Sequence, residues 1–242
     1  MARVDGRKAN ELRQITIQRG FTKAAPGSVL IKTGQTHVLC TATIEESVPK
    51  WRKDSGLGWV TSEYEMLPGS TGERRARNRG GKIDGRTQEI QRLIGRSLRA
   101  VVDMAKLGDR TIWLDCDVLQ ADGGTRTASI TGAYVALVDA IRHLRREKLL
   151  RVDPLTDSVA AVSVGLIGGK VLLDLCYKED SKAEVDATVV QTGRGQFVEI
   201  QATAEAGTFS QARMAKMLAI AGKGVRQLHG IQQTALRARR RG

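Results

Sequence analysis

The residues from Asp122 to Ser129 have the composition of an anion-binding turn. They read Asp-Gly-Gly-Thr-Arg-Thr-Ala-Ser. Two adjacent glycines let the backbone approach a ligand closely or adopt a positive φ. A helix beginning near Thr125 would add unpaired N–H groups and a partial positive charge, and the guanidinium of Arg126 matches phosphate oxygens. The turn therefore predicts a phosphate site at Gly124, Thr125 and Arg126; the alternative is an ordinary strand-to-helix turn with Asp122 or Thr125 as the helix N-cap.

The segment from Asp174 to Asp186 contains clustered carboxylates. Ser181 and Lys182 are expected to form a β-hairpin turn, which would bring Asp180 and Asp186 together. Paired carboxylates can bind a divalent cation together with phosphate oxygens, or transfer a proton when one of them has a raised pKa. The alternative is an acidic turn that is solvated and inert.

Residues 70–82 form a basic stretch with no apolar periodicity, which is typical of a flexible loop. Its cationic side chains are Arg74, Arg75, Arg77, Arg79 and Lys82. In a chain that already carries a net charge of +13, this loop predicts a contact with the backbone of RNA or DNA. The alternative is a solvated surface loop.

A helix is expected directly after this loop, ending at Gly108. Its apolar face is formed by Ile90, Leu93, Ile94, Leu98, Val101, Val102 and Ala105. Arg86 lies in the first turn, where a cation opposes the helix dipole unless an anion also binds there. The alternative is an exposed Arg86 that points away. Arg92 and Arg96 extend the basic face of the helix toward RNA.

Strand-like segments surround these four stretches and are expected to position them. In the first half they are residues 14–19, 28–33, 36–44, 58–64 and 111–119; in the second half they are 159–167, 170–177, 183–191 and 196–204. Further helices are expected from about residue 125 to 150 and from 209 to 235. We therefore expect a single domain over residues 1–242, with one β-rich half to about 150, a second over 151–236, and a basic tail over 237–242.

The composition is that of a basic globular protein. Lys and Arg number 39 against 26 Asp and Glu, which gives a pI near 10.1 and predicts a polyanionic partner such as nucleic acid. No stretch approaches the roughly 20 apolar residues of a membrane span, and the N-terminus has no apolar signal region. We expect a cytoplasmic protein without membrane contact, in which the cysteines Cys40, Cys116 and Cys176 are buried free thiols.

The sequence resembles the ribonuclease PH family over essentially its whole length. The most specific run is Leu-Asp-Cys-Asp-Val-Leu-Gln-Ala-Asp-Gly-Gly-Thr-Arg-Thr-Ala-Ser-Ile-Thr-Gly at 114–132. Residues 3–7, 85–103, 179–186 and 202–207 fit the same family. The resemblance implies an α+β fold like the second domain of ribosomal protein S5, with two layers of β-sheet and helix, and a homo-hexameric ring made of three dimers.

The resemblance also implies an activity. A member of this family is a phosphorolytic exoribonuclease that uses inorganic phosphate as co-substrate to trim the 3′ ends of tRNA precursors. It releases nucleoside diphosphates, can add nucleotides to RNA 3′ ends in reverse, and uses Mg²⁺ or Mn²⁺. The competing interpretation is a non-catalytic RNA-binding ring subunit of the same fold, which lacks the phosphate-binding arginine or the carboxylates.

Roles carry over by motif. Arg86 and the Gly124, Thr125 and Arg126 group would bind phosphate, with Arg126 also counted as catalytic. Asp180 and Asp186 would form the metal and acid site, and the loop from Arg74 to Arg79 would hold the tRNA. The chain keeps the arginine and both aspartates, which favours a catalytic member. It departs from the family at Val4, where proline is usual, and at Thr188, where asparagine is frequent.

Overall fold

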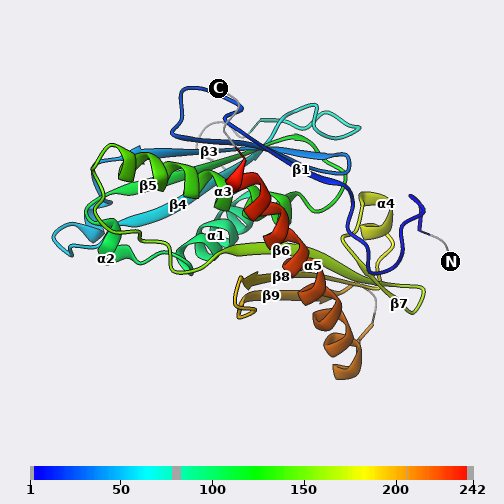
Figure 1. Cartoon of the computed structure of the whole chain (residues 1–242). Helices are drawn as coiled ribbons and strands as arrows, with labels where there is room; N and C mark the ends of the chain where they lie inside the picture. Colours follow the sequence, from blue (N-terminus) through cyan, green and yellow to red (C-terminus); the bar gives the residue numbers. More distant parts are fainter. Residues whose placement is uncertain (1–2, 78–82, 206, 239–242) are drawn as a thin grey trace.

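The computed structural model describes residues 3–77, 83–205 and 207–238, which form two β-sheets and several helices (Figure 1). The first sheet has the strand order β1-β2-β3-β5-β4. Its strands are β1 (Ile15–Arg19), β2 (Gly27–Thr33), β3 (Thr36–Glu45), β4 (Trp59–Met66) and β5 (Thr111–Gln120). A 3₁₀ turn, η1 (Lys50–Arg52), lies between β3 and β4.

Two connections in this sheet position the residues of the candidate site. A tight turn joins β2 to β3, with Gly34 at a φ of 55° and Thr33 paired with Thr36. Strands β4 and β5 pair in parallel, with Met66 opposite Val118. Parallel neighbours need a crossover, supplied here by α1 (Gly85–Arg99) and α2 (Met104–Leu107). The carboxyl ends of β4 and β5 therefore meet at one edge of the sheet. The basic loop that starts at residue 70 and the anion-binding turn from Asp122 to Ser129, called the glycine turn below, both begin there.

The second sheet has the order β7-β6-β8-β9, and each neighbouring pair is antiparallel. Its strands are β6 (Val159–Ile167), β7 (Lys170–Leu173), β8 (Val185–Thr192) and β9 (Phe197–Ala204). The long helix α5 (Gln211–Arg237) packs across β6, β7 and β8 and reaches β1 of the first sheet (Figure 1).

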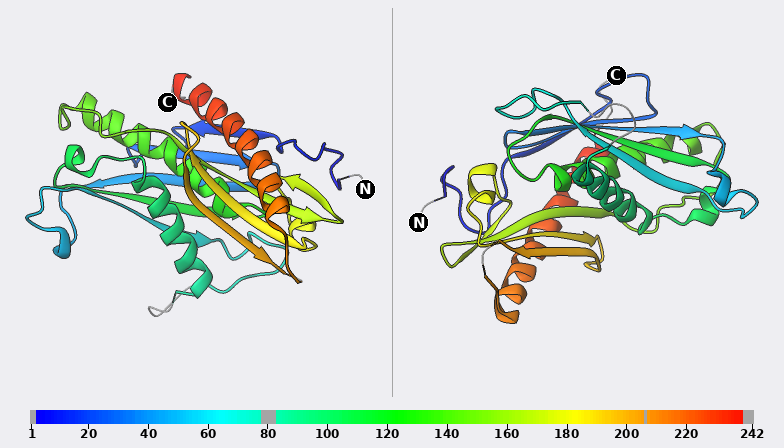
Figure 2. Two further views of the ribbon diagram at one scale, coloured as in Figure 1. Left: turned by 90° about the horizontal axis from the view of Figure 1, so that it is seen from below. Right: turned by 180° about the vertical axis from the view of Figure 1, so that it is seen from behind.

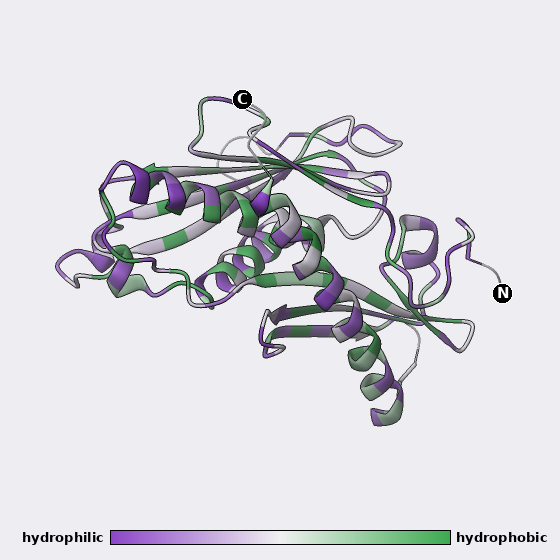
Figure 3. Ribbon diagram, viewed as in Figure 1, coloured by the Kyte–Doolittle hydropathy of each residue, from purple (hydrophilic) through white to green (hydrophobic). Residues whose placement is uncertain are grey.

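Helix α3 (Thr125–Arg146) lies between the two sheets and contacts β2, β3 and β6 (Figure 2). Most of its residues are buried, and its hydrophilic residues gather toward the C-terminal end (Figure 3). One core unites both sheets around α3 and α1, because Val159, Ala161 and Val190 of the second sheet pack into it. The α+β class with two sheet-and-helix layers is therefore confirmed.

The predicted continuous helix from residue 86 to Gly108 is wrong at its C-terminal end. Helix α1 stops at Arg99, and α2 is a separate turn capped by the carboxylate of Asp103, which accepts from the N–H groups of Ala105 and Lys106. Between the helices, Val102 forms a β-bridge with Leu155. The apolar periodicity of the sequence continues past Arg99, but the bridge to Leu155 and the cap at Asp103 interrupt the helix there.

The predicted strand over residues 170–177 is confirmed only as far as Leu173, and the hairpin predicted at Ser181 and Lys182 is wrong. Strand β7 ends at Leu173, because Asp174 has a φ of 54°, outside the β region. The short helix α4 (Tyr177–Asp180) follows. Glu179 caps its N-terminus, because its carboxylate accepts from the backbone N–H of Cys176.

Two expectations from composition can be compared with the fold. Cys40, Cys116 and Cys176 are buried and free, as predicted. Among the residues that the structure describes, no helix combines the length and apolar character required to cross a bilayer.

Candidate active site

A cleft of about 1020 Å³ lies where the two halves of the chain meet. Its lining includes the cationic side chains of Arg74, Arg75, Arg86 and Arg126, the glycine turn, and the carboxylates of Asp180 and Asp186. The cleft thus brings together the predicted phosphate-binding residues and the predicted metal-binding pair. They come from the edge of the first sheet, the start of α1, the start of α3, α4 and β8.

The glycine turn presents the N-terminus of α3 to this cleft. Gly123 and Gly124 have φ values of 73° and 66°, and no side chain caps the helix. A Cβ atom at Gly123 would lie 2.7 Å from the carbonyl oxygen of Leu175, so this position requires glycine. The alternative that Asp122 or Thr125 caps the helix is therefore wrong. Among the described residues, no side chain caps the first N–H groups of α3, which leaves them able to bind an anion.

Arg126 projects from the first turn of α3 between α1 and β9. Its Nη1 lies 3.4 Å from Oε1 of Glu89 and 3.3 Å from Oε1 of Gln201. Both contacts are long for hydrogen bonds, and the guanidinium has five donors. Most of its hydrogen-bonding capacity therefore remains available to an anion in the cleft.

Arg86 occupies the first turn of α1. The N-cap of that helix is Asp84, which accepts from the backbone N–H of Thr87. Arg86 is exposed and lines the cleft. The alternative, in which Arg86 points away, is therefore not what the structure shows, and two arginines from different helices line the cleft with the glycine turn.

Tyr64 contacts the first residue of α3, a role that the sequence analysis did not predict. Its hydroxyl lies 2.8 Å from Oγ1 of Thr125, and the residue is 2% exposed. Burial raises the pKa of Tyr64, although its hydrogen bond with Thr125 opposes the shift. The phenol therefore stays protonated and can hold the Thr125 hydroxyl in place.

The carboxylates of Asp180 and Asp186 approach the cleft from α4 and β8. Val185 and Ala187 pack in the core beneath α5, so the strand alternation turns Asp186 and Thr188 toward the opposite face. Burial, followed by the negative charge of Asp186, raises the pKa of Asp180, whereas Arg126 and Arg86 lower it. The two carboxylates are thus near enough to interact, although a helix end rather than a hairpin brings them together.

A divalent cation fits this pair. Oδ1 of Asp186 is buried and has no hydrogen-bond partner, and a hard cation is a natural partner for such an oxygen. In the described residues, no group of three or more His, Cys, Asp or Glu side chains is arranged to hold a metal ion. The remaining ligands would therefore be water or phosphate oxygens, as is common for Mg²⁺.

The residues predicted to bind RNA divide into two groups. Arg74 and Arg75 line the cleft, Arg77 is exposed beyond them, and Arg79 lies outside the described residues. The other two predicted residues, Arg92 and Arg96, are exposed on α1 and do not line the cleft. The guanidinium of Arg96 makes two hydrogen bonds of 2.7 Å to Glu199, so two of its five donors are engaged within the protein.

Comparison with known proteins identifies the family of this chain. Residues 11–142 match the model for domain 1 of the 3′ exoribonuclease family, and residues 157–224 match domain 2. The chain belongs to the 3′ exoribonuclease family. Ribonuclease PH of Corynebacterium efficiens is 57% identical over 235 residues, which cover 97% of this chain and 96% of that protein. The resemblance to ribonuclease PH, and with it the activity of a phosphorolytic 3′-to-5′ exoribonuclease, is confirmed.

Solved structures share the fold at lower identity. The crystal structure of rice (Oryza sativa) Rrp46 matches with a TM-score of 0.79 and 18% identity, covering 97% of this chain and 100% of that one. The Archaeoglobus fulgidus exosome with RNA bound to the active site matches with a TM-score of 0.81 and 23% identity, covering 95% and 92%.

Glu179, beside Asp180, forms a buried ion pair with Arg3 that should make stability depend on pH. The shortest contact is 2.6 Å, and the side chains are 3% and 5% exposed. Burial opposes ionisation of Glu179, but the hydrogen bonds and charge of Arg3 outweigh it and lower the pKa of Glu179.

We expect this ion pair to stabilise the fold above the unfolded-state pKa of about 4.3, and the stabilisation to disappear as the pH falls through the lower folded-state pKa. Glu179→Gln should therefore lower the free energy of unfolding at neutral pH, and the difference from the wild type should shrink in acid. Urea unfolding of both proteins across this range measures it. An equal difference at every pH would contradict the prediction.

Proposed function

We propose that the protein trims the 3′ ends of tRNA precursors by phosphorolysis in the cleft described above, releasing nucleoside diphosphates and adding nucleotides to RNA 3′ ends in reverse. The observation that supports this proposal is the arrangement of an uncapped, arginine-flanked helix N-terminus beside a carboxylate pair in one cleft. The first can hold inorganic phosphate, and the second can serve the scissile phosphodiester.

Charge governs the reaction. An oxygen of inorganic phosphate forms a bond to the phosphorus of the last phosphodiester while the bond from that phosphorus to the 3′-oxygen breaks. Both reactants are anions, so they must be neutralised before they can approach. In the proposal, Arg86, Arg126 and the backbone N–H groups at Thr125 hold the inorganic phosphate in line. A cation such as Mg²⁺ or Mn²⁺, held at the Asp180 and Asp186 pair with Asp186 as its ligand, would offset charge on the scissile group.

The leaving 3′-oxygen needs a proton. Asp180 is the better candidate for the acid, because burial and the neighbouring carboxylate of Asp186 raise its pKa. Asp186 then has the role of cation ligand, which its unpartnered buried oxygen favours. Thr188 lines the cleft two residues further along β8, where it can contact water bound to the cation.

The proposed function is tested with a 3′-terminally labelled RNA, incubated with and without inorganic phosphate. Release of labelled nucleoside diphosphate only when phosphate is present supports phosphorolysis. Release of monophosphate would instead indicate hydrolysis, and no release with retained RNA binding would indicate a non-catalytic ring subunit.

The loop arginines Arg74, Arg75 and Arg77 are proposed to hold the tRNA body. Replacing all three with Ala should weaken tRNA binding while leaving phosphorolysis of a very short RNA unchanged. Each lost phosphate contact should reduce the log–log slope of affinity against salt by roughly 0.7–0.9. Filter binding over a salt series measures the slope, and an unchanged slope would leave the loop as solvated surface.

The assembly is proposed to be a homo-hexamer of three dimers that acts in the cytoplasm, with residues 1–242 forming a single domain. The matches to exosome structures support the assembly, and the core shared around α3 supports the single domain. Light scattering during gel filtration tests the assembly: a mass six times that of the chain is expected.

A further inference from the structure

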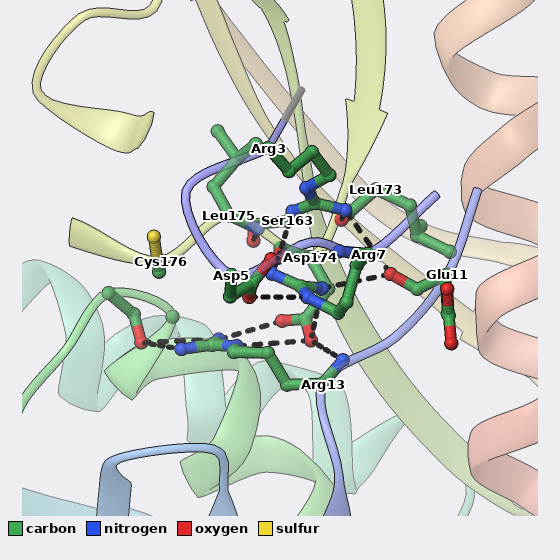
Figure 4. Close-up of polar contacts among 12 residues, drawn as sticks. Arg3, Asp5, Arg7, Glu11, Arg13, Ser163, Leu173, Asp174, Leu175 and Cys176 are labelled. Carbon is green, nitrogen blue, oxygen red and sulfur yellow. Dashed lines mark hydrogen bonds and ion pairs between the residues drawn. The ribbon is translucent and has the colours of Figure 1, made fainter. Parts of the chain in front are cut away.

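Arg13 forms a buried ion pair that joins the two halves of the chain (Figure 4). Its Nη2 lies 2.7 Å from Oδ1 of Asp174, and its Nε lies 3.1 Å from Oδ2. The backbone N–H of Arg13 also donates to Oδ2, at 2.8 Å. Each side chain is 4% exposed. Neither residue lines the cleft, so the ion pair joins parts of the protein and does not contact a ligand bound there.

The third guanidinium nitrogen of Arg13, Nη1, contacts the glycine turn. Nη1 donates to the carbonyl oxygen of Asp122 at 2.6 Å and lies 3.4 Å from that of Gly123. A Cβ atom at Gly124 would lie only 2.9 Å from Nη2. The guanidinium therefore packs directly against the backbone that carries the phosphate-binding N–H groups, and one planar fork contacts both the turn and Asp174.

Asp174 is equally tied to the other side of the cleft. Its φ of 54° turns the chain out of β7 and toward α4, the helix that ends at Asp180. The N-terminus of α4 returns to the glycine turn, because the backbone N–H of Tyr177 donates to Oδ1 of Asp122 at 3.1 Å. A closed circuit of contacts thus runs from Asp174 through Arg13 and the turn to α4.

We propose that Arg13 and Asp174 are positioning residues that fix the phosphate-binding turn relative to the carboxylate of Asp180. The inference rests on the proposed role of the turn in holding phosphate. A displacement of about 1 Å between reacting groups can cost roughly 10²-fold in rate, and the turn and Asp180 come from distant parts of the chain. An ion pair with a planar, multidentate fork fixes both distance and angle, which an apolar contact does not.

The test is Arg13→Lys, which keeps the charge and loses the fork. We expect the KM for inorganic phosphate to rise about tenfold to a hundredfold, while the affinity for RNA stays at the wild-type value. Asp174→Asn, which tolerates the left-handed backbone, should raise the same KM. The double variant should be no worse than the poorer single variant, since both changes break one circuit. Additive effects in the double variant would overturn the inference.

The matched control is Arg19→Lys. Arg19 forms a second buried ion pair, with Asp139, and donates to the carbonyl groups of Ala235 and Ala238 at the end of α5. Asp139 lies 15 residues beyond Gly124 along α3, or about 20 Å. Arg19→Lys should lower the melting temperature, as Arg13→Lys does, without changing the KM for phosphate. An equal rise of KM in both variants would reduce the effect to general destabilisation and overturn the proposal.

Two further measurements separate the possible failures. If wild-type protein releases no nucleoside diphosphate with phosphate, the proposed function is wrong, whatever Arg13 does. If Arg13→Lys does not fold, Asp122→Ala decides, because it removes only the acceptor for the N–H of Tyr177 at a half-buried position. A raised KM for phosphate in Asp122→Ala supports the circuit, and a wild-type KM overturns it.

Discussion

Asp186→Asn is expected to lower the single-turnover rate of phosphorolysis by about 10²-fold to 10⁴-fold. The substitution keeps the shape of the side chain and removes its charge. In the structure, Oδ1 of Asp186 is buried without a partner, so an asparagine there would offer a cation a weaker oxygen or turn an N–H group toward it. The cation affinity should fall together with the rate, and Asp180→Asn should behave similarly.

RNA binding should survive both substitutions, because it depends on the arginines. The control is Glu184→Gln. Glu184 lies two residues before Asp186, its carboxylate accepts from the N–H of Gly169 at 3.2 Å, and it does not line the cleft. Rates measured while Mg²⁺ is titrated, beside a separate RNA-binding assay, check the prediction. Near-normal turnover in both aspartate variants would contradict a catalytic role for this segment and favour the alternative of an inert acidic turn.

The glycine turn could be predicted from the sequence because its chemistry is local. Gly123, Gly124 and Arg126 follow a strand and open a helix within a few residues, so backbone freedom, helix dipole and cation coincide. The strand pattern is equally local: the predicted bounds of β6 equal the observed ones, and those of β2, β3 and β8 differ by one or two residues at an end.

The parts that could not be predicted depend on contacts between distant residues. Nothing near Asp174 signals its positive φ, which accompanies an ion pair with a residue 161 positions away. The strand predicted there is confirmed only in part, and the hairpin is wrong, for that reason. Tyr64 reads as an ordinary inward strand residue, and only the fold shows its hydroxyl beside Thr125, 61 positions along the chain. Likewise, the bridge from Val102 to Leu155 interrupts the helix at a point where the local apolar periodicity predicts that it continues.

Arg126→Ala is expected to weaken the use of inorganic phosphate far more than the binding of RNA. Loss of one charged hydrogen-bond donor costs about 1.5–3 kcal/mol, which raises the required phosphate concentration by roughly tenfold to more than a hundredfold. Arg86→Ala should act in the same direction, because both guanidinium groups line the cleft beside the helix N-terminus. Initial rates over a phosphate series, at fixed RNA concentration, give the change in KM.

The structure makes this substitution easy to interpret. The protein partners of Arg126 are long contacts, and Glu89 is 45% exposed, so its carboxylate stays hydrated when the arginine is removed. The loss therefore reports on the ligand rather than on the fold. Arg145→Ala provides a control on the same helix: its partner Asp153 is 45% exposed, and it lies 19 residues from Arg126, or about 28 Å. Unchanged phosphate dependence in both cleft variants, or an equal change in Arg145→Ala, would remove the two arginines from the phosphate site.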